Sequence, residues 1–117
     1  MKIEKVFLYD NLCDPDLQEE LFGEKFDSDQ YMDYVTNWDL VSIKINGDLR
    51  KVVIEGGERT TIIGHVNYVP VEKLNIMDKH YGREFIRIKV TTMLDSDCSL
   101  YIKRTDKIKS KLNFNNR

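Results

Sequence analysis

The chain has 117 residues, of which 41% are hydrophobic and 32% are charged, and its net charge is −2. This length and composition predict one globular domain with one hydrophobic core. The near-neutral charge does not favour a nucleic-acid-binding protein, and no apolar run approaches the roughly 20 residues of a membrane-spanning helix. The sequence does not begin with a signal-peptide pattern, so we expect a cytoplasmic protein.

The amino-acid usage is unusual in one respect, because the sequence contains no alanine and is rich in lysine, aspartate, isoleucine and asparagine. Such a bias is typical of AT-rich viral or bacterial genomes, and a phage is one source that fits it. The two cysteines, Cys13 and Cys98, are far apart in the sequence. In the cytoplasm we expect them to be reduced thiols rather than a disulfide.

The first predicted element is a buried central strand over residues 5–9, because this run is apolar on both faces. Asp10-Asn11 then favours a turn. A short helix is predicted over residues 15–22, with Asp14 as its N-cap. A strand, a bend and a helix start place several backbone N–H groups at one rim. The segment is therefore either an anion cradle or an ordinary strand-to-helix turn.

Strand signals dominate the rest of the chain. Residues 31–45 predict one or two strands that break near Asn37, and Asn46-Gly47 is a strong signal for a hairpin whose partner strand covers residues 50–54. The remaining predicted elements are a strand over 60–69, a helix from Pro70 to about Tyr81, a strand over 84–94 and a last strand over 99–103.

These elements predict an α+β fold: a small, mixed, mainly antiparallel β-barrel with two short flanking helices. We expect a single domain over residues 1–104 and a basic C-terminal tail over residues 105–117.

Three stretches carry a resemblance to a known family. They are Val6-Phe7-Leu8-Tyr9 with Leu12, then Gly64-His65-Val66-Asn67-Tyr68-Val69, then Leu74 to Val90 with Met77, Asp78, Gly82, Phe85 and Arg87. In order and spacing, from Val6 to Lys103, the chain resembles the γ-glutamylcyclotransferase-like family, which includes the γ-glutamylamine cyclotransferases and the AIG2-like proteins. The resemblance implies a small mixed domain built around a β-barrel.

The chain departs from the family motifs at the two places that carry the chemistry. The family's first strand usually ends in Tyr-Gly-Ser/Thr-Leu, whose backbone amides hold the α-carboxylate of the substrate, whereas this strand ends in Tyr9-Asp10-Asn11-Leu12. Asp10 replaces the glycine and should repel a carboxylate. The family's catalytic glutamate, in Leu-Asp-x-x-Glu-Gly, is replaced by Tyr81. A phenol with a pKa near ~10 is a poor base at neutral pH, and losing an acid/base group typically costs about 10²–10⁴-fold in rate.

We therefore expect a protein that has lost cyclotransferase activity and binds a small polar molecule. The expected ligand-binding residues are Tyr9, Asp10, Asn11, Leu12, Tyr81 and Arg87, and Tyr81 holds the catalytic position without being active. Arg87, which faces outward on its predicted strand, would meet a carboxylate or phosphate of the ligand or be solvated.

Two alternatives stay open. One is an enzyme of altered chemistry in which Tyr81, His80 or Glu84 replaces the missing carboxylate, and the other is an inhibitory module that binds a host protein. We expect no cofactor. We also expect no metal site, because His65 and His80 do not lie at metal-ligand spacing to each other or to the cysteines.

Overall fold

The computed structural model describes residues 2–105. The strands are β1 (Ile3–Leu8), β2 (Asp27–Ser28), β3 (Asp33–Thr36), β4 (Trp38–Ile45), β5 (Asp48–Glu55), β6 (Thr61–Pro70), β7 (Phe85–Thr91) and β8 (Asp97–Lys103), and the α-helices are α1 (Pro15–Phe22) and α2 (Leu74–Tyr81). Short 3₁₀ turns, Asn11–Cys13 and Val71–Lys73, follow β1 and precede α2. Of the predicted basic tail, residues 106–117 lie outside the described residues.

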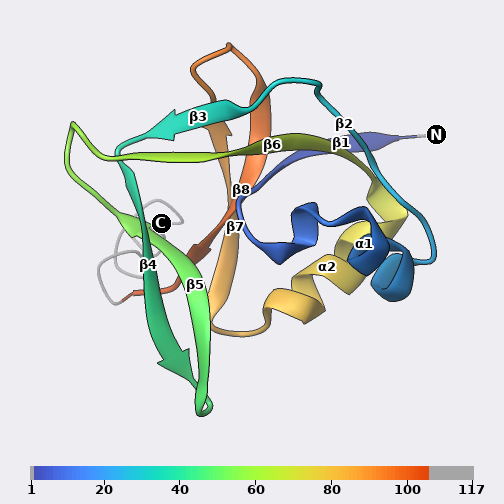
Figure 1. Cartoon of the computed structure of the whole chain (residues 1–117), viewed down its shortest axis with the longest axis horizontal. Coiled ribbons are helices and arrows are strands. Elements are labelled where there is room, and N and C mark those ends of the chain that lie inside the picture. The colour runs from blue at the N-terminus through green and yellow to red at the C-terminus, as the bar shows by residue number, and fades with distance from the viewer. Residues whose placement is uncertain (1, 106–117) are drawn as a thin grey trace, which may run out of the picture.

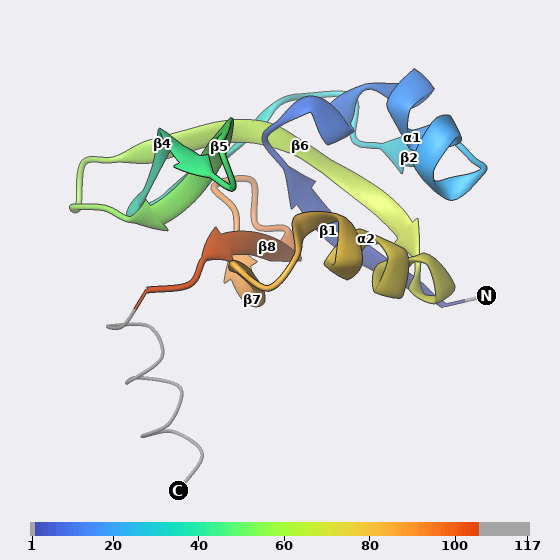
Figure 2. The same ribbon diagram turned by 90° about the horizontal axis from the view of Figure 1, so that it is seen from below.

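The predicted fold class is confirmed. A six-stranded sheet has the order β2-β6-β1-β8-β7, with β3 also paired to β6, and β4 and β5 form a separate two-stranded sheet. All pairs are antiparallel except that of β1 with β8. The sheets do not close into a continuously paired barrel. The β4–β5 hairpin lies at one end of the molecule and both helices lie at the other (Figure 1 and Figure 2).

Strand β1 is the centre of the sheet, as its apolar sequence predicted. It pairs with β6 on one side and with β8 on the other. Val6 and Leu8 pack into one hydrophobic cluster, whereas Phe7 and Tyr9 pack into a second cluster on the opposite face. Both faces of this strand are buried, so neither face needs polar side chains. This explains why apolar and polar residues do not alternate along it.

Helix α1 begins and ends where the sequence predicted. The Asp14 side chain accepts a hydrogen bond from Asp16 N (2.9 Å), and Gly23 ends the helix in a left-handed conformation with φ 78°. Gln18 is fully buried: its Nε2 donates to Leu12 O (2.6 Å) and its Oε1 accepts from Phe26 N (2.9 Å). This side chain joins α1 to the turn that follows β1, a role that the sequence did not reveal.

The β4–β5 hairpin forms as predicted. Ile45 pairs with Asp48 across a two-residue turn in which Asn46 and Gly47 both have positive φ, 52° and 86°. This is the conformation that an Asn-Gly turn favours, because its twist matches that of the strands. The predicted break near Asn37 is also confirmed, at φ 73°.

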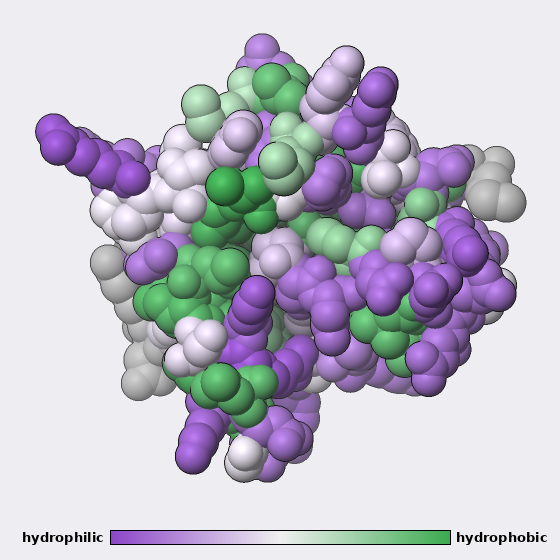
Figure 3. All heavy atoms as spheres, in the orientation of Figure 1, coloured by the Kyte–Doolittle hydropathy of each residue, from purple (hydrophilic) through white to green (hydrophobic). Residues whose placement is uncertain are grey.

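Some boundaries differ from those predicted. The strand expected over residues 84–94 ends at Thr91, because Thr92 N bonds to Ser96 O (2.9 Å) and turns the chain. Figure 3 shows polar and charged side chains over most of one face, with apolar residues gathered over the β4–β5 hairpin. None of the helices in residues 2–105 is long and apolar enough to cross a membrane.

Candidate functional site

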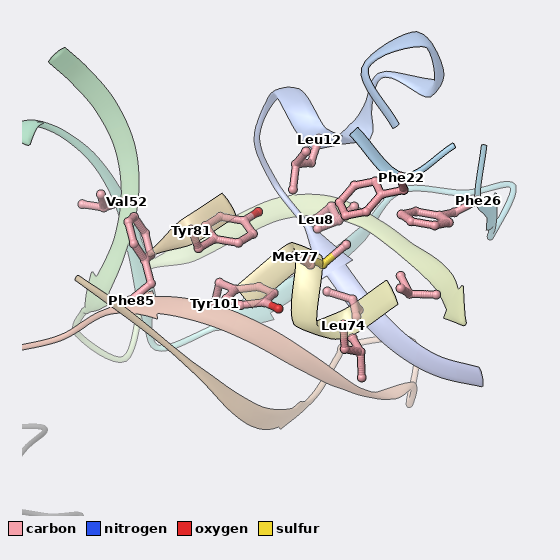
Figure 4. Close-up of a cluster of buried hydrophobic side chains, with 12 residues drawn as sticks. Leu8, Leu12, Phe22, Phe26, Val52, Leu74, Met77, Tyr81, Phe85 and Tyr101 are labelled. Atoms are coloured by element: carbon pink, nitrogen blue, oxygen red, sulfur yellow. The ribbon is translucent and has the colours of Figure 1, made fainter. Parts of the chain in front are cut away.

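A layer of aromatic rings fills the space beside the C-terminus of α2. The ring of Tyr81, the last residue of α2, stacks on that of Tyr101 from β8, with centroids 4.0 Å apart and 15° between the planes. Phe85 lies 5.3 Å from Tyr81, centroid to centroid. Figure 4 shows these three side chains between α2 and the sheet. The side chain at the predicted catalytic position, Tyr81, is therefore a buried phenol that is only 2% exposed.

The structure brings Asp10 and Tyr81 together. The Tyr81 hydroxyl donates to both carboxylate oxygens of Asp10, at 3.2 Å to Oδ1 and 3.0 Å to Oδ2. Asp10 Oδ1 also accepts from Leu12 N (3.1 Å) and so caps the turn after β1. Burial raises the pKa of the Asp10 carboxyl, while the bonds from Leu12 and Tyr81 act against that rise. Asp10 and Tyr81, two of the residues expected from the sequence to bind a ligand, are therefore hydrogen-bonded to each other.

Neither Tyr81 nor Tyr9 can act as a base at neutral pH. Burial and the nearby Asp10 carboxylate raise the pKa of Tyr81 well above the ordinary 10.0 of a tyrosine. Burial likewise raises the pKa of Tyr9, whose hydroxyl donates to Tyr101 O (2.8 Å). Both phenols stay protonated and serve as hydrogen-bond donors.

A hollow of about 450 Å³ opens where β1 ends. Its lining residues are Asp10, Asn11, Leu49, Arg50, Lys51 and His80, and we call it the strand-end hollow. Carboxylate and cations therefore face the same space. Arg50 is held in place because its Nη1 donates to Tyr81 O (3.3 Å) and its guanidinium carbon lies 4.8 Å from the centroid of the Phe85 ring.

His80 lines the strand-end hollow as a neutral ring. Its side chain is half-buried, and its ring centroid lies 5.5 Å from that of Tyr81 in an edge-to-face contact. Burial lowers the pKa of His80 below the ordinary 6.5, with Arg50 acting in the same direction and Asp10 against it. The hollow therefore holds an uncharged imidazole at pH 7.

The predicted site residues do not all border one hollow. Asp10 and Asn11 line the strand-end hollow, whereas Tyr9, Leu12 and Tyr81 are buried and do not line it. Arg87 lines a different hollow, together with Asp78 and Tyr101, and its Nε lies 3.4 Å from Asp78 Oδ1. The same oxygen accepts from the Tyr101 hydroxyl (2.5 Å). The stacked pair Tyr81–Tyr101 therefore lies between Asp10 and Arg87.

Sequence reasoning missed Arg50 and Lys51. They lie on β5, far from Asp10 in the chain, and no local pattern links the hairpin to the end of β1. Two residues weighed from the sequence lie outside both hollows. Glu84 forms an ion pair with Lys103 (2.8 Å), and the Cys13 thiol donates to Leu8 O (3.2 Å) while burial raises its pKa to about 11. Within residues 2–105, no group of three or more His, Cys, Asp or Glu side chains could hold a metal ion.

No protein-family model matches the sequence, and no curated protein matches it. Solved structures do match. A protein of Arabidopsis thaliana, solved in solution, is 15% identical with a TM-score of 0.74, over 99% of this chain and 85% of that one. A γ-glutamyl cyclotransferase is 14% identical with a TM-score of 0.68, over 89% of this chain and 68% of that one. The chain has the γ-glutamyl cyclotransferase fold.

An uncharacterized protein of Homo sapiens shares this γ-glutamyl cyclotransferase fold, with 15% identity and a TM-score of 0.69 over 90% of this chain and 69% of that one. At such identities the likeness establishes the fold alone. A fold does not determine an activity, which depends on the side chains that line the hollows of this chain.

Proposed function

We propose that this protein binds a small zwitterionic molecule in the strand-end hollow and does not cyclise γ-glutamyl compounds. The observation that carries the proposal is that the Asp10 carboxylate and the cations of Arg50 and Lys51 line the same hollow. A ligand ammonium group would bind Asp10, and a ligand carboxylate would bind the two cations. A volume of about 450 Å³ is in the range typical of small-molecule sites.

The loss of cyclotransferase activity is supported by the state of Tyr81. Cyclotransfer needs one group to take a proton from the attacking amine and to protonate the leaving amine. At the position of the family's glutamate, the chain has a buried phenol whose hydroxyl donates to Asp10 and whose pKa lies well above 10.0. Such a group cannot accept the proton of the attacking amine at neutral pH.

Asp10 favours a second candidate function, an enzyme of altered chemistry. Its carboxyl is largely buried, has a raised pKa and borders the hollow next to Tyr81. A carboxyl tuned upward in this way can exchange protons as an acid and a base. The sequence suggested Tyr81, His80 or Glu84 as replacements for the missing glutamate, and Asp10 is a further candidate that the sequence treated only as a repulsive charge.

Binding and turnover can be measured on the same preparation. We expect isothermal titration calorimetry with L-glutamine and related zwitterionic amino acids to give binding, and incubation with γ-glutamyl dipeptides and γ-glutamyl amines to release no 5-oxoproline. Arg50→Met should abolish the binding. Lys44→Met is the matched control, because Lys44 is an exposed cation on the same hairpin that lines neither hollow.

Three outcomes would contradict the proposal. If no zwitterion binds, the hollow is not a zwitterion site. If Lys44→Met weakens binding as much as Arg50→Met, charge alone explains the effect. If 5-oxoproline is released and Asp10→Asn stops its release, the chain is an enzyme that uses Asp10.

The biological setting remains a proposal of the same kind. A phage source, which the alanine-free composition fits, would make a host metabolite in the cytoplasm the target. Native mass spectrometry of the purified protein separates the remaining alternatives. A retained small molecule supports sequestration, whereas a retained host protein favours the inhibitory protein-binding module.

A further inference from the structure

The hollow that contains Arg87 is a second candidate site. Its volume is about 580 Å³, and we call it the arginine hollow. Four basic residues line it: Lys79 from α2, Arg83 from the turn before β7, Arg87 from β7 and Arg104 just after β8. It shares no lining residue with the strand-end hollow. The turn before β7 and the chain after β8 are held together by the hydrogen bond from Arg104 N to Glu84 O (2.8 Å).

The basic residues that line the arginine hollow outnumber the acidic ones. Asp78 is the one acidic residue among the described lining residues, and it already accepts the Tyr101 hydroxyl and pairs with Arg87 Nε. Arg87 uses only Nε in that pair, so both terminal nitrogens of its guanidinium remain available. Within residues 2–105, the side chains of Lys79, Arg83 and Arg104 form no ion pair. Four cations therefore face one engaged carboxylate.

The floor of the arginine hollow is apolar. Phe85, Ile86 and Tyr101 line it, and the rings of Phe85 and Tyr101 are almost completely buried and packed against Tyr81. Lys79 alone has a simpler explanation, because a cation in the last turn of α2 interacts favourably with the helix dipole. The three arginines come from other segments and have no such explanation.

We propose that the arginine hollow binds a small organic phosphate, with the phosphate held by the arginines and an apolar part of the ligand on the floor. The planar fork of an arginine matches the oxygens of a phosphate or a carboxylate. The excess of cations favours the dianionic phosphate over a single carboxylate. The apolar floor favours an organic body over the inorganic ion.

The test measures binding of phenyl phosphate to the full chain by isothermal titration calorimetry, with inorganic phosphate and benzoate as comparison ligands. Phenyl phosphate should bind more tightly than either, because only it carries both the dianion and the ring. Arg83→Glu should weaken it about ten- to hundredfold, the loss expected when a charged hydrogen-bonding partner is removed. Arg59→Glu is the matched control, an exposed arginine in the turn between β5 and β6 that lines neither hollow.

A further variant separates this site from the strand-end hollow. Lys51→Ala should leave phenyl phosphate binding unchanged, because Lys51 lines only the strand-end hollow. Circular dichroism should give the same unfolding midpoint for the wild type, Arg83→Glu and Arg59→Glu. If Arg83→Glu does not fold, Arg104→Ala takes its place with the same expected loss of affinity.

Several results would overturn the inference. Failure of the wild type to bind phenyl phosphate would contradict it directly. Equal losses in Arg83→Glu and Arg59→Glu would show an effect of net charge. Benzoate binding as tightly as phenyl phosphate would exclude a phosphate site, and inorganic phosphate binding as tightly would exclude a role for the floor.

Discussion

The two hollows are connected through a pair of stacked, buried rings and differ in the chemistry of their linings. Tyr101 lines the arginine hollow, and Tyr81, which stacks on it, donates to Asp10 of the strand-end hollow. On one side of Tyr81, the strand-end hollow combines Asp10 with cations from the β4–β5 hairpin. On the other side, the arginine hollow combines an apolar floor with arginines from the β7 and β8 segments. The two stacked rings come from α2 and β8, and the charged lining residues come from other segments except for Asp78 and Lys79, which are on α2.

The position of α2 explains how neighbouring residues reach different hollows. Successive side chains of an α-helix are about 100° apart around its axis. Lys79 therefore lines the arginine hollow, His80 lines the strand-end hollow, and Tyr81 points inward between them. This rotation of about 100° per residue is enough to place the cation of Lys79 and the neutral imidazole of His80 on opposite sides of the Tyr81 ring.

Removing the Tyr81 ring should have the largest effect on stability. Tyr81→Ala deletes a buried ring that stacks on Tyr101 and removes the side-chain donor to the Asp10 carboxylate. We expect the free energy of unfolding to fall by about 3–5 kcal/mol, as for other large aromatic residues in a core. Urea unfolding measures the loss. Tyr31→Ala, at a side chain that is 70% exposed, is the control and should change stability by no more than about 0.5 kcal/mol. Comparable losses in both variants would argue against a stabilising role for the buried Tyr81 ring.

The charge of the strand-end hollow should appear in the pH dependence of stability. The pKa of Asp10 is raised above its ordinary 3.8 in the folded state, so the folded protein holds this proton more tightly than the unfolded chain does. The stability that this proton adds is complete below pH 3.8 and is lost as the pH rises through the folded-state pKa. Each tenfold gain in proton affinity contributes about 1.4 kcal/mol.

Asp10→Asn measures that contribution. The unfolding free energy of the wild type minus that of Asp10→Asn should fall as the pH rises through this window, and then stay constant. Thermal or urea unfolding between acid and neutral pH records the difference. Asp48→Asn, at an exposed position of the hairpin, is the matched control. A difference for Asp10→Asn that stays flat across the whole range would contradict a raised pKa.

The smallest effect is expected at the turn between β4 and β5, the strand that carries the cations of the strand-end hollow. Gly47→Ala places a side chain at φ 86°, a conformation that costs L-residues up to about 1–2 kcal/mol. Gly57→Ala is the control, because Gly57 does not have positive φ and a Cβ there meets nothing within 4 Å. Urea unfolding should show a loss for Gly47→Ala only. Binding in the strand-end hollow should weaken with it, while phenyl phosphate binding in the arginine hollow should not.

Predictions from the sequence were reliable where the signal was local. The central strand, the cap at Asp14 and the turn at Asn46-Gly47 each depend on a few consecutive residues, and all are confirmed. The candidate site was predicted less completely. Asp10 and Tyr81 were identified as the two departures from the family motifs, but their hydrogen bond, 71 positions apart in the chain, could not be foreseen. The expectation that Arg87 and Asp10 border one pocket did not allow for a stacked ring between them.

The amino-acid sequence by itself determined most of the segments that become strands, helices and turns, and it placed Tyr81 at the end of the second helix. These properties follow from apolar patterning, capping residues and backbone preferences, all of which act over short distances along the chain. Only the tertiary structure decided that Asp10 bonds to this phenol, that Arg50 and Asp10 line one hollow, and that Arg87 lines another. Burial, pKa and charge pairing depend on side chains from distant segments, so they come into existence only when the sheet and the helices pack together.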